Sequence, residues 1–191
     1  PFAMEIYNWP RFMPGAAYAF NERAARKRAA ELVRRIEDYR AQRPGRPVFV
    51  VGHSGGGAMA VFTAEAMPEG RPIDGVVTLA PALSPGYELH RALEGCAGRF
   101  LNCYSRKDYF LLTLTSIGQN FDGKRGATAG QEGFTSLPAM VNEDAGDRRA
   151  GQLEWDESMR RTGNRGGHKG WASSRWVADT LAPLLSEWSA D

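Results

Sequence analysis

The sequence has few of the residues that form disulfide bonds in small secreted domains or that bind metals. Its 191 residues include two cysteines, Cys96 and Cys103, and three histidines. Two cysteines make neither a disulfide framework nor a zinc site, and a metal-ligand spacing such as H-E-x-x-H is absent. We therefore expect no metal ion in this protein.

Long hydrophobic runs are also missing. No apolar stretch approaches the roughly 18 residues that a membrane-spanning helix needs, and no signal-peptide pattern is present. Hydrophobic residues make up 42% of the chain and charged residues 24%, an ordinary globular balance. We expect one domain over residues 1–191 and no membrane span, and we favour a cytoplasmic location.

The charge is nearly balanced. The net charge is +2, and lysine is scarce, with 4 Lys against 20 Arg. The basic residues of the N-terminal region follow one face of a helical pattern whose other face is apolar: Arg23, Arg26, Lys27, Arg34 and Arg35. A solvated helix face explains this pattern better than a nucleic-acid surface does, so we expect no nucleic-acid partner.

Short apolar runs typical of strands alternate with helical patterns. We predict strands at 2–7, 48–51, 75–79, 99–104 and 153–155, and helices at 21–39, 58–66, 87–93 and from Ser173 or Ser174 onward. Strands that alternate with helices indicate a parallel sheet covered on both faces. The expected fold class is therefore a three-layer α/β/α sandwich with a mostly parallel sheet.

The sequence Gly52-His53-Ser54-Gly55-Gly56 fits the pattern G-x-S-x-G. The apolar strand at 48–51 runs directly into it, and a small-residue helix follows, which is the setting of the strand-to-helix turn called the nucleophile elbow. We interpret Gly52 and Gly56 as positions where a side chain would collide as strand and helix pack. A phosphate-binding loop is disfavoured, because no lysine follows the glycines.

With this motif and element order, the chain resembles the α/β-hydrolase family in its esterase and lipase branch, from the first predicted strand to the last helix. The family's order of nucleophile, acid and base implies Ser54, Asp108 and His168 as a catalytic triad. It implies that His168 takes the serine proton, that Asp108 orients the imidazole, and that the Gly55 amide is one oxyanion donor. No organic cofactor is implied.

The other histidines and acids fit these roles less well. His53 lies inside the turn with its side chain directed away from the serine, so packing or a hydrogen bond beneath the site is expected. His90 lies in a short polar helix and suits the surface. The substitute acids are Asp122, Glu154 and Asp156, whereas Asp74 precedes its strand and lies at the wrong edge of the sheet.

The chain differs from the family pattern before the strand at 48–51, which leads into the nucleophile elbow. One strand and one helix precede Val48, so the fold is expected to be N-terminally truncated relative to the family. The loop that supplies the second oxyanion donor is then missing, and residues 9–15 are the nearest replacement. A fragment of a longer hydrolase, a sheet completed by a partner chain and a rebuilt oxyanion hole all remain open. Self-association through the unprotected strand at 2–7 is expected.

The residues after Asp108 bear on the substrate. The apolar segment 109–114 is interpreted as a core helix in preference to an acyl pocket or lid. The residues considered for a substrate pocket are Trp9, Tyr109, Phe110 and Trp171. The predicted function is a serine hydrolase of small carboxylic esters. Thioesterase, peptidase and acyltransferase activities use the same residues, and the alternative from another class is a catalytically inactive binding or assembly module.

Overall fold

A computed structural model describes residues 3–7, 22–97, 99–110, 119–139 and 150–190. The sheet has four strands: β1 (Phe49–His53), β2 (Gly75–Leu79), β3 (Phe100–Tyr104) and β4 (Ala150–Glu154). They lie in the order β1-β2-β3-β4, and every neighbouring pair is parallel. The predicted parallel sheet is confirmed, and β2 has the predicted bounds.

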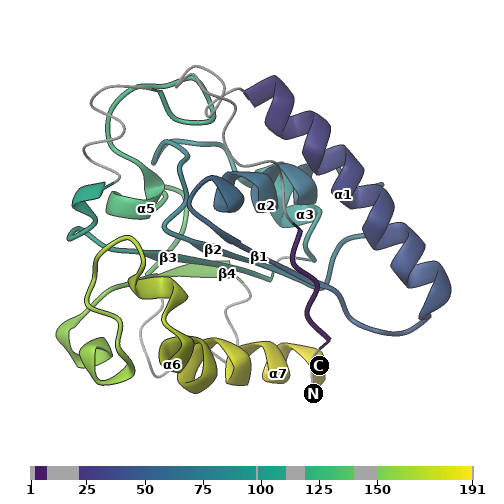
Figure 1. The fold of residues 1–191 in the computed structure, drawn as a ribbon. Coiled ribbons are helices and arrows are strands. Elements are labelled where there is room, and N and C mark those ends of the chain that lie inside the picture. The colour runs from purple at the N-terminus through teal and green to yellow at the C-terminus, as the bar shows by residue number, and fades with distance from the viewer. Residues whose placement is uncertain (1–2, 8–21, 98, 111–118, 140–149, 191) are drawn as a thin grey trace.

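Helices cover the sheet on both faces (Figure 1). On one face lie α1 (Glu22–Gln42), α2 (Gly55–Glu65) and α3 (His90–Glu94). The other face carries α6 (Ser174–Trp176), the π-helical segment η3 (Val177–Leu181) and α7 (Ala182–Ala190). Three short elements complete the described chain: α5 (Ala129–Glu132) and the 3₁₀ helices η1 (Glu157–Thr162) and η2 (Gly170–Ala172). The predicted three-layer α/β/α arrangement is confirmed.

Burial explains why the sequence forms these layers. Every residue of β2 and β3 is buried, as expected of central parallel strands between two helix layers. The amphipathic helix α1 buries the stripe Ala25, Ala29, Val33 and Ile36, while its predicted basic face is exposed. Tyr39, predicted for the apolar stripe, is instead 38% exposed near the end of α1.

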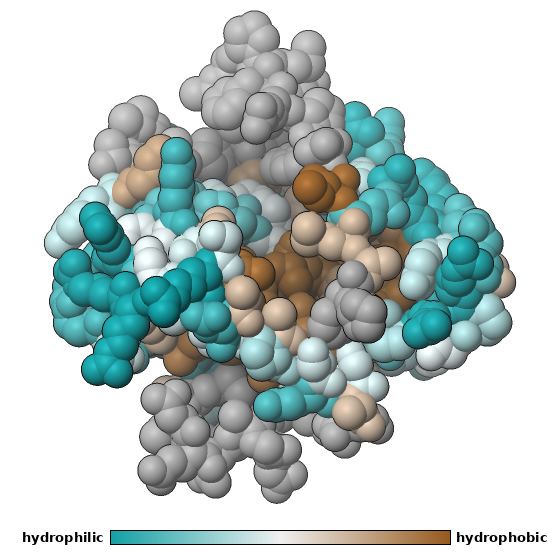
Figure 2. Space-filling view, turned by 60° about the horizontal axis from the view of Figure 1, so that its bottom comes forward, coloured by the Kyte–Doolittle hydropathy of each residue, from teal (hydrophilic) through white to brown (hydrophobic). Residues whose placement is uncertain are grey.

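The strand β1 lies at an edge of the sheet. Its Val51 is 42% exposed, and Phe49 and Val50 are only partly buried. Figure 2, turned so that the lower side of Figure 1 comes forward, shows apolar surface gathered in a hollow between hydrophilic flanks.

None of the helices in the described ranges is long and apolar enough to cross a bilayer.

The N-terminal strand prediction is wrong for residues 3–7. These residues form no ladder and lie against α1, where the Tyr7 hydroxyl reaches the Arg28 carbonyl oxygen at 3.5 Å and Arg35 pairs with Glu5 at 3.0 Å. A strand needs a partner strand to satisfy its backbone, and the neighbour here is a helix, which residues 5 and 7 contact through their own side chains. Self-association through this segment stays a prediction.

Buried polar side chains connect the strands to α5, at the carboxyl ends of the strands. Thr78 donates to the Asn102 side chain at 2.8 Å, and the Asn102 amide donates to the Ala129 carbonyl oxygen at 3.3 Å. Gln131 of α5 in turn donates to the carbonyl oxygen of Asp108 at 3.3 Å. This network fixes the backbone of Asp108 relative to the sheet.

Candidate functional site

Ser54 sits at a sharp turn between β1 and α2. Its backbone has φ 58° and ψ −121°, a conformation that costs a non-glycine residue about 1–3 kcal/mol. Three backbone hydrogen bonds hold it there: the Ser54 amide donates to Leu79 at 2.8 Å, and the Ser54 carbonyl oxygen accepts from Gly57 at 2.9 Å and from Ala82 at 3.2 Å. The strained residue is thus tied to the end of β2 and to the first turn of α2.

The glycines around the turn have different roles. A Cβ at Gly52 would lie 2.0 Å from the Gly56 carbonyl oxygen, so this position needs glycine for the strand and helix to approach. Gly56 was predicted to be a second such position, but a Cβ there would meet no atom within 4 Å. The tight position is Gly57, whose Cβ would lie 2.8 Å from Cβ of Pro81, in the segment after β2. The motif alone does not reveal Gly57, because this contact is long-range.

Asp108 and His168 lie together, 60 residues apart in the chain. Nδ1 of His168 is 2.7 Å from Oδ2 of Asp108. The Asp108 side chain is fully buried, and that of His168 is 11% exposed. Asp108 follows β3 in a turn closed by its own amide, which donates to the Ser105 carbonyl oxygen at 3.0 Å. A buried carboxylate bonded to Nδ1 leaves Nε2 of the imidazole as the ring nitrogen that can accept a proton.

His168 also lies beside His53, the residue before Ser54. The two ring centroids are 4.6 Å apart, and Nε2 of His53 is 2.7 Å from the His168 carbonyl oxygen. Burial lowers the pKa of His53. These contacts bring His168 to the segment that carries Ser54. Within the described residues, no hydrogen bond joins the Ser54 hydroxyl to His168.

Aromatic surface adjoins His168. The Phe110 ring lies 4.7 Å from the His168 ring, and Phe110 and Tyr109 are 56% and 69% exposed. These two residues are helical, as predicted, but they are exposed, so the prediction that they belong to the core is wrong. The rest of that segment, residues 111–114, and the predicted pocket residue Trp9, with the loop 9–15, lie outside the described residues. Trp171 is fully buried against Trp176 at 5.1 Å, so it belongs to the core rather than to an open pocket.

The substitute acids are engaged elsewhere. Asp122 accepts a hydrogen bond from the Ser84 hydroxyl, and Glu154 accepts one from Tyr104 at 2.9 Å. Asp156 caps η1 by accepting from the amide of Ser158 at 2.7 Å. The surface placement predicted for His90 is confirmed, since it is an exposed residue at the start of α3. Asp108 is thus the acid that contacts the predicted base.

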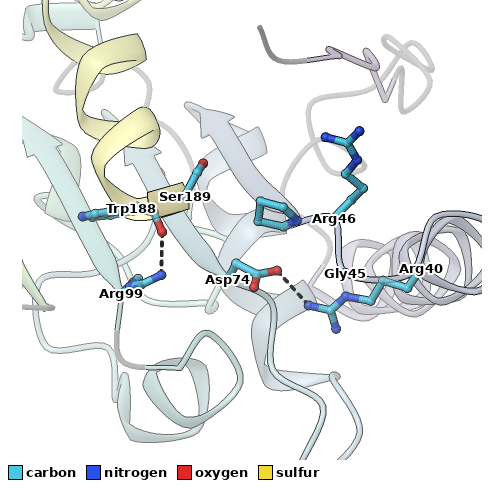
Figure 3. Close-up of a pocket in the computed structure, with 8 residues that line it drawn as sticks. Arg40, Gly45, Arg46, Asp74, Arg99, Trp188 and Ser189 are labelled. Carbon is cyan, nitrogen blue, oxygen red and sulfur yellow. Dashed lines mark hydrogen bonds and ion pairs between the residues drawn. The ribbon is translucent and has the colours of Figure 1, made fainter. Parts of the chain in front are cut away.

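A separate cavity of about 380 Å³ lies at the amino ends of the strands, away from the carboxyl ends that carry Ser54 and Asp108 (Figure 3). Asp74 and Arg99 line it, and they directly precede β2 and β3. Arg40 and Asp74 face each other there and form an ion pair of 3.0 Å, while Arg99 donates to the Trp188 carbonyl oxygen at 2.7 Å. Asp74 lies at the amino ends of the strands, as predicted, and away from the candidate site.

The described residues hold no cluster of three or more His, Cys, Asp or Glu that is placed for a metal ion.

Comparison with known proteins gives two similarities. Residues 25–119 match the family described as serine aminopeptidase, S33. A solved structure, a predicted CIB-like hydrolase from Thermoplasma acidophilum, is 16% identical with a TM-score of 0.43. The alignment covers 85% of this chain and 59% of that one, so this chain spans less than two thirds of that protein's length. No curated protein matches the chain.

The family match covers most of α1, the sheet from β1 to β3 and both segments that carry Ser54 and Asp108. With a parallel sheet whose first strand turns sharply into a helix at Ser54, the chain belongs to the α/β-hydrolase family.

Proposed function

We propose that the chain is a serine hydrolase that cleaves carboxylic esters with Ser54 as nucleophile, His168 as base and Asp108 as the acid that orients it. The observation that carries the proposal is the 2.7 Å contact between Nδ1 of His168 and the fully buried carboxylate of Asp108. A buried carboxylate beside an imidazole stabilises the charged imidazolium that forms when the base takes a proton.

The reaction proceeds in two steps. His168 Nε2 removes the Ser54 hydroxyl proton as Oγ attacks the ester carbonyl carbon, and the imidazolium then protonates the departing alkoxide as the acyl C–O bond breaks. In the second step His168 takes a proton from water, and the hydroxide attacks the acyl carbon. The acid product leaves when Oγ departs and regains the proton from His168.

The start of α2 supports the negative charge that develops on the carbonyl oxygen. Gly55 is the first residue of α2, and the first amides of a helix have no acceptor within the helix. We assign the Gly55 amide as one oxyanion donor, aided by the helix dipole. Loss of one such donor typically lowers kcat by about 10²–10³.

The surface beside His168 favours an ester with an apolar acyl group. Phe110 and Tyr109 expose large aromatic areas at this edge, and the Phe110 ring contacts the base directly. Apolar acyl chains gain free energy by covering such surface, at roughly 25 cal/mol per Å².

A fluorophosphonate probe tests the proposal, because it phosphonylates an activated serine. We expect labelling of the wild type, none of Ser54→Ala, and unchanged labelling of His90→Ala, which alters an exposed histidine outside the site. A correctly folded wild type that does not label would favour the inactive binding module instead.

A second candidate is a peptidase, favoured by the description of the matching family as serine aminopeptidase. The same acyl-enzyme chemistry cleaves amides once the leaving amine is protonated. Rates on an aminoacyl p-nitroanilide and on a short-chain p-nitrophenyl ester distinguish the two. Faster turnover of the anilide, dependent on Ser54, would replace the esterase proposal with the peptidase.

A further inference from the structure

His53 makes a contact that the triad does not use. Its Nε2 is 2.7 Å from the carbonyl oxygen of His168, across 115 residues of sequence. A carbonyl oxygen only accepts hydrogen bonds, so the proton of His53 must lie on Nε2. Burial lowers the pKa of His53, which keeps the ring neutral and leaves Nδ1 without a proton. This bond fixes the tautomer of His53 and engages its one N–H.

The segment that carries His168 is fixed at its two ends, since Trp155 Nε1 donates to the Asn164 carbonyl oxygen at 3.0 Å and Trp171 is fully buried. Gly163, Gly166, Gly167 and Gly170 surround His168, and glycine gives the backbone wide conformational freedom. A turn bond from the Gly170 amide to the Gly167 carbonyl oxygen, 2.8 Å, shapes this segment locally but does not tie it to the sheet. The Asp108 bond holds the far side of the imidazole, and the His53 bond holds the backbone beside β1.

We propose that His53 is a positioning residue, whose Nε2–H clamps the His168 backbone and so sets the base relative to Ser54. The inference rests on the proposed function. Because His53 precedes Ser54 directly, its side chain links the strand that positions the nucleophile to the loop that positions the base. Two anchors, at Nδ1 and at the backbone carbonyl, fix the direction of the His168 ring better than either does alone. Misplacement of a catalytic group by about 1 Å can lower the rate about 10²-fold.

Two substitutions at His53 separate the clamp from simple packing. His53→Phe keeps an aromatic ring against His168 and removes the N–H, whereas His53→Gln loses the ring and keeps a side-chain N–H donor near the same place. If His53 is a clamp, kcat on a p-nitrophenyl ester falls about 10–100-fold in His53→Phe, with KM within about twofold, and falls less in His53→Gln. The matched substitutions His90→Phe and His90→Gln, at an exposed histidine, should leave kcat unchanged. Equal loss in both His53 variants, or a more active Phe variant, would mean that the ring merely packs.

Two measurements that need no activity keep the test decisive if the variants fold poorly or the enzyme is inactive. In Ser54→Ala protein, ¹⁵N NMR of the imidazoles should show His53 as the Nε2–H tautomer, and finding the proton on Nδ1 would overturn the clamp. Exchange of the Gly170 amide should be faster in His53→Phe than in His53→Gln. Ester turnover that survives Ser54→Ala would instead contradict the proposed function, and the tautomer would still decide the clamp.

Discussion

Replacing Gly52 by alanine probes the turn that positions Ser54. The added Cβ would lie 2.0 Å from the Gly56 carbonyl oxygen and 2.4 Å from its carbon, whereas real Cβ contacts stay above 3.0 Å. The strand and helix must therefore separate by at least the difference, 3.0 minus 2.0, or 1.0 Å. The obstacle is backbone, which cannot rotate away as a flexible side chain can.

Overpacking typically costs 1–3 kcal/mol, and a rigid backbone obstacle leads us to expect about 3 kcal/mol for Gly52→Ala. For a chain of this length that lowers the melting temperature by roughly 6–12 °C. The matched control is Gly56→Ala, where nothing lies within 4 Å and removal of a helical glycine stabilises by about 0.5–1 kcal/mol. Urea unfolding and thermal melting of both variants measure the difference. Equal stability of the two variants, or a Gly52→Ala protein as stable as wild type, would refute the close approach of β1 and α2.

Three further predictions concern the site. Asp108→Asn should lower kcat about 10⁴-fold, since an amide favours the wrong imidazole tautomer. The control is Glu154→Gln, which alters an acid that does not contact the base and should change kcat less than about threefold. A similar loss in both would contradict the assignment. Phe110→Ala should raise KM roughly fivefold for an ester with a longer acyl chain, which corresponds to about 1 kcal/mol of lost apolar contact. KM for an acetyl ester should stay nearly constant. Equal effects on both esters would argue against an acyl-binding surface at Phe110. Burial lowers the pKa of His53 in the folded protein, so the unfolded chain binds a proton at this residue more readily than the folded protein does. The contribution of His53 to the free energy of unfolding is therefore fully present above about pH 6.5 and is lost as the pH falls. The drop in melting temperature between pH 7.5 and 5.0 should then be smaller in His53→Gln than in wild type, and an equal drop would contradict the pKa shift.

Features encoded in contiguous sequence were predictable. The strand predicted at 75–79 is β2 with the same bounds, and all of its residues are buried. The glycines around Ser54 specify a turn, since few other residues permit so tight a strand-to-helix connection. The positions of Asp108 and His168 came from a resemblance, and the structure places the two side chains in contact, while their catalytic roles stay predictions.

Features that depend on distant partners were not predictable. Residues 3–7 are apolar enough for a strand, but whether they form one depends on the neighbour that the fold supplies, and that neighbour is α1. The contact of Gly57 with Pro81 and that of His53 with the His168 carbonyl join segments whose proximity no local pattern records. Phe110 shows the same limit, because its apolar character suits a core as well as a substrate surface.

The central claim is an acyl-enzyme on Ser54, and trapping that species tests it most directly. The protein is mixed with a short-chain p-nitrophenyl ester, quenched in acid within the first turnovers and digested for mass spectrometry. We predict that the peptide containing Ser54 carries the acyl mass in the wild type, and that the corresponding peptide of Ser54→Ala carries none. Ester turnover with no acyl group on Ser54, or turnover that persists in Ser54→Ala, would contradict the account.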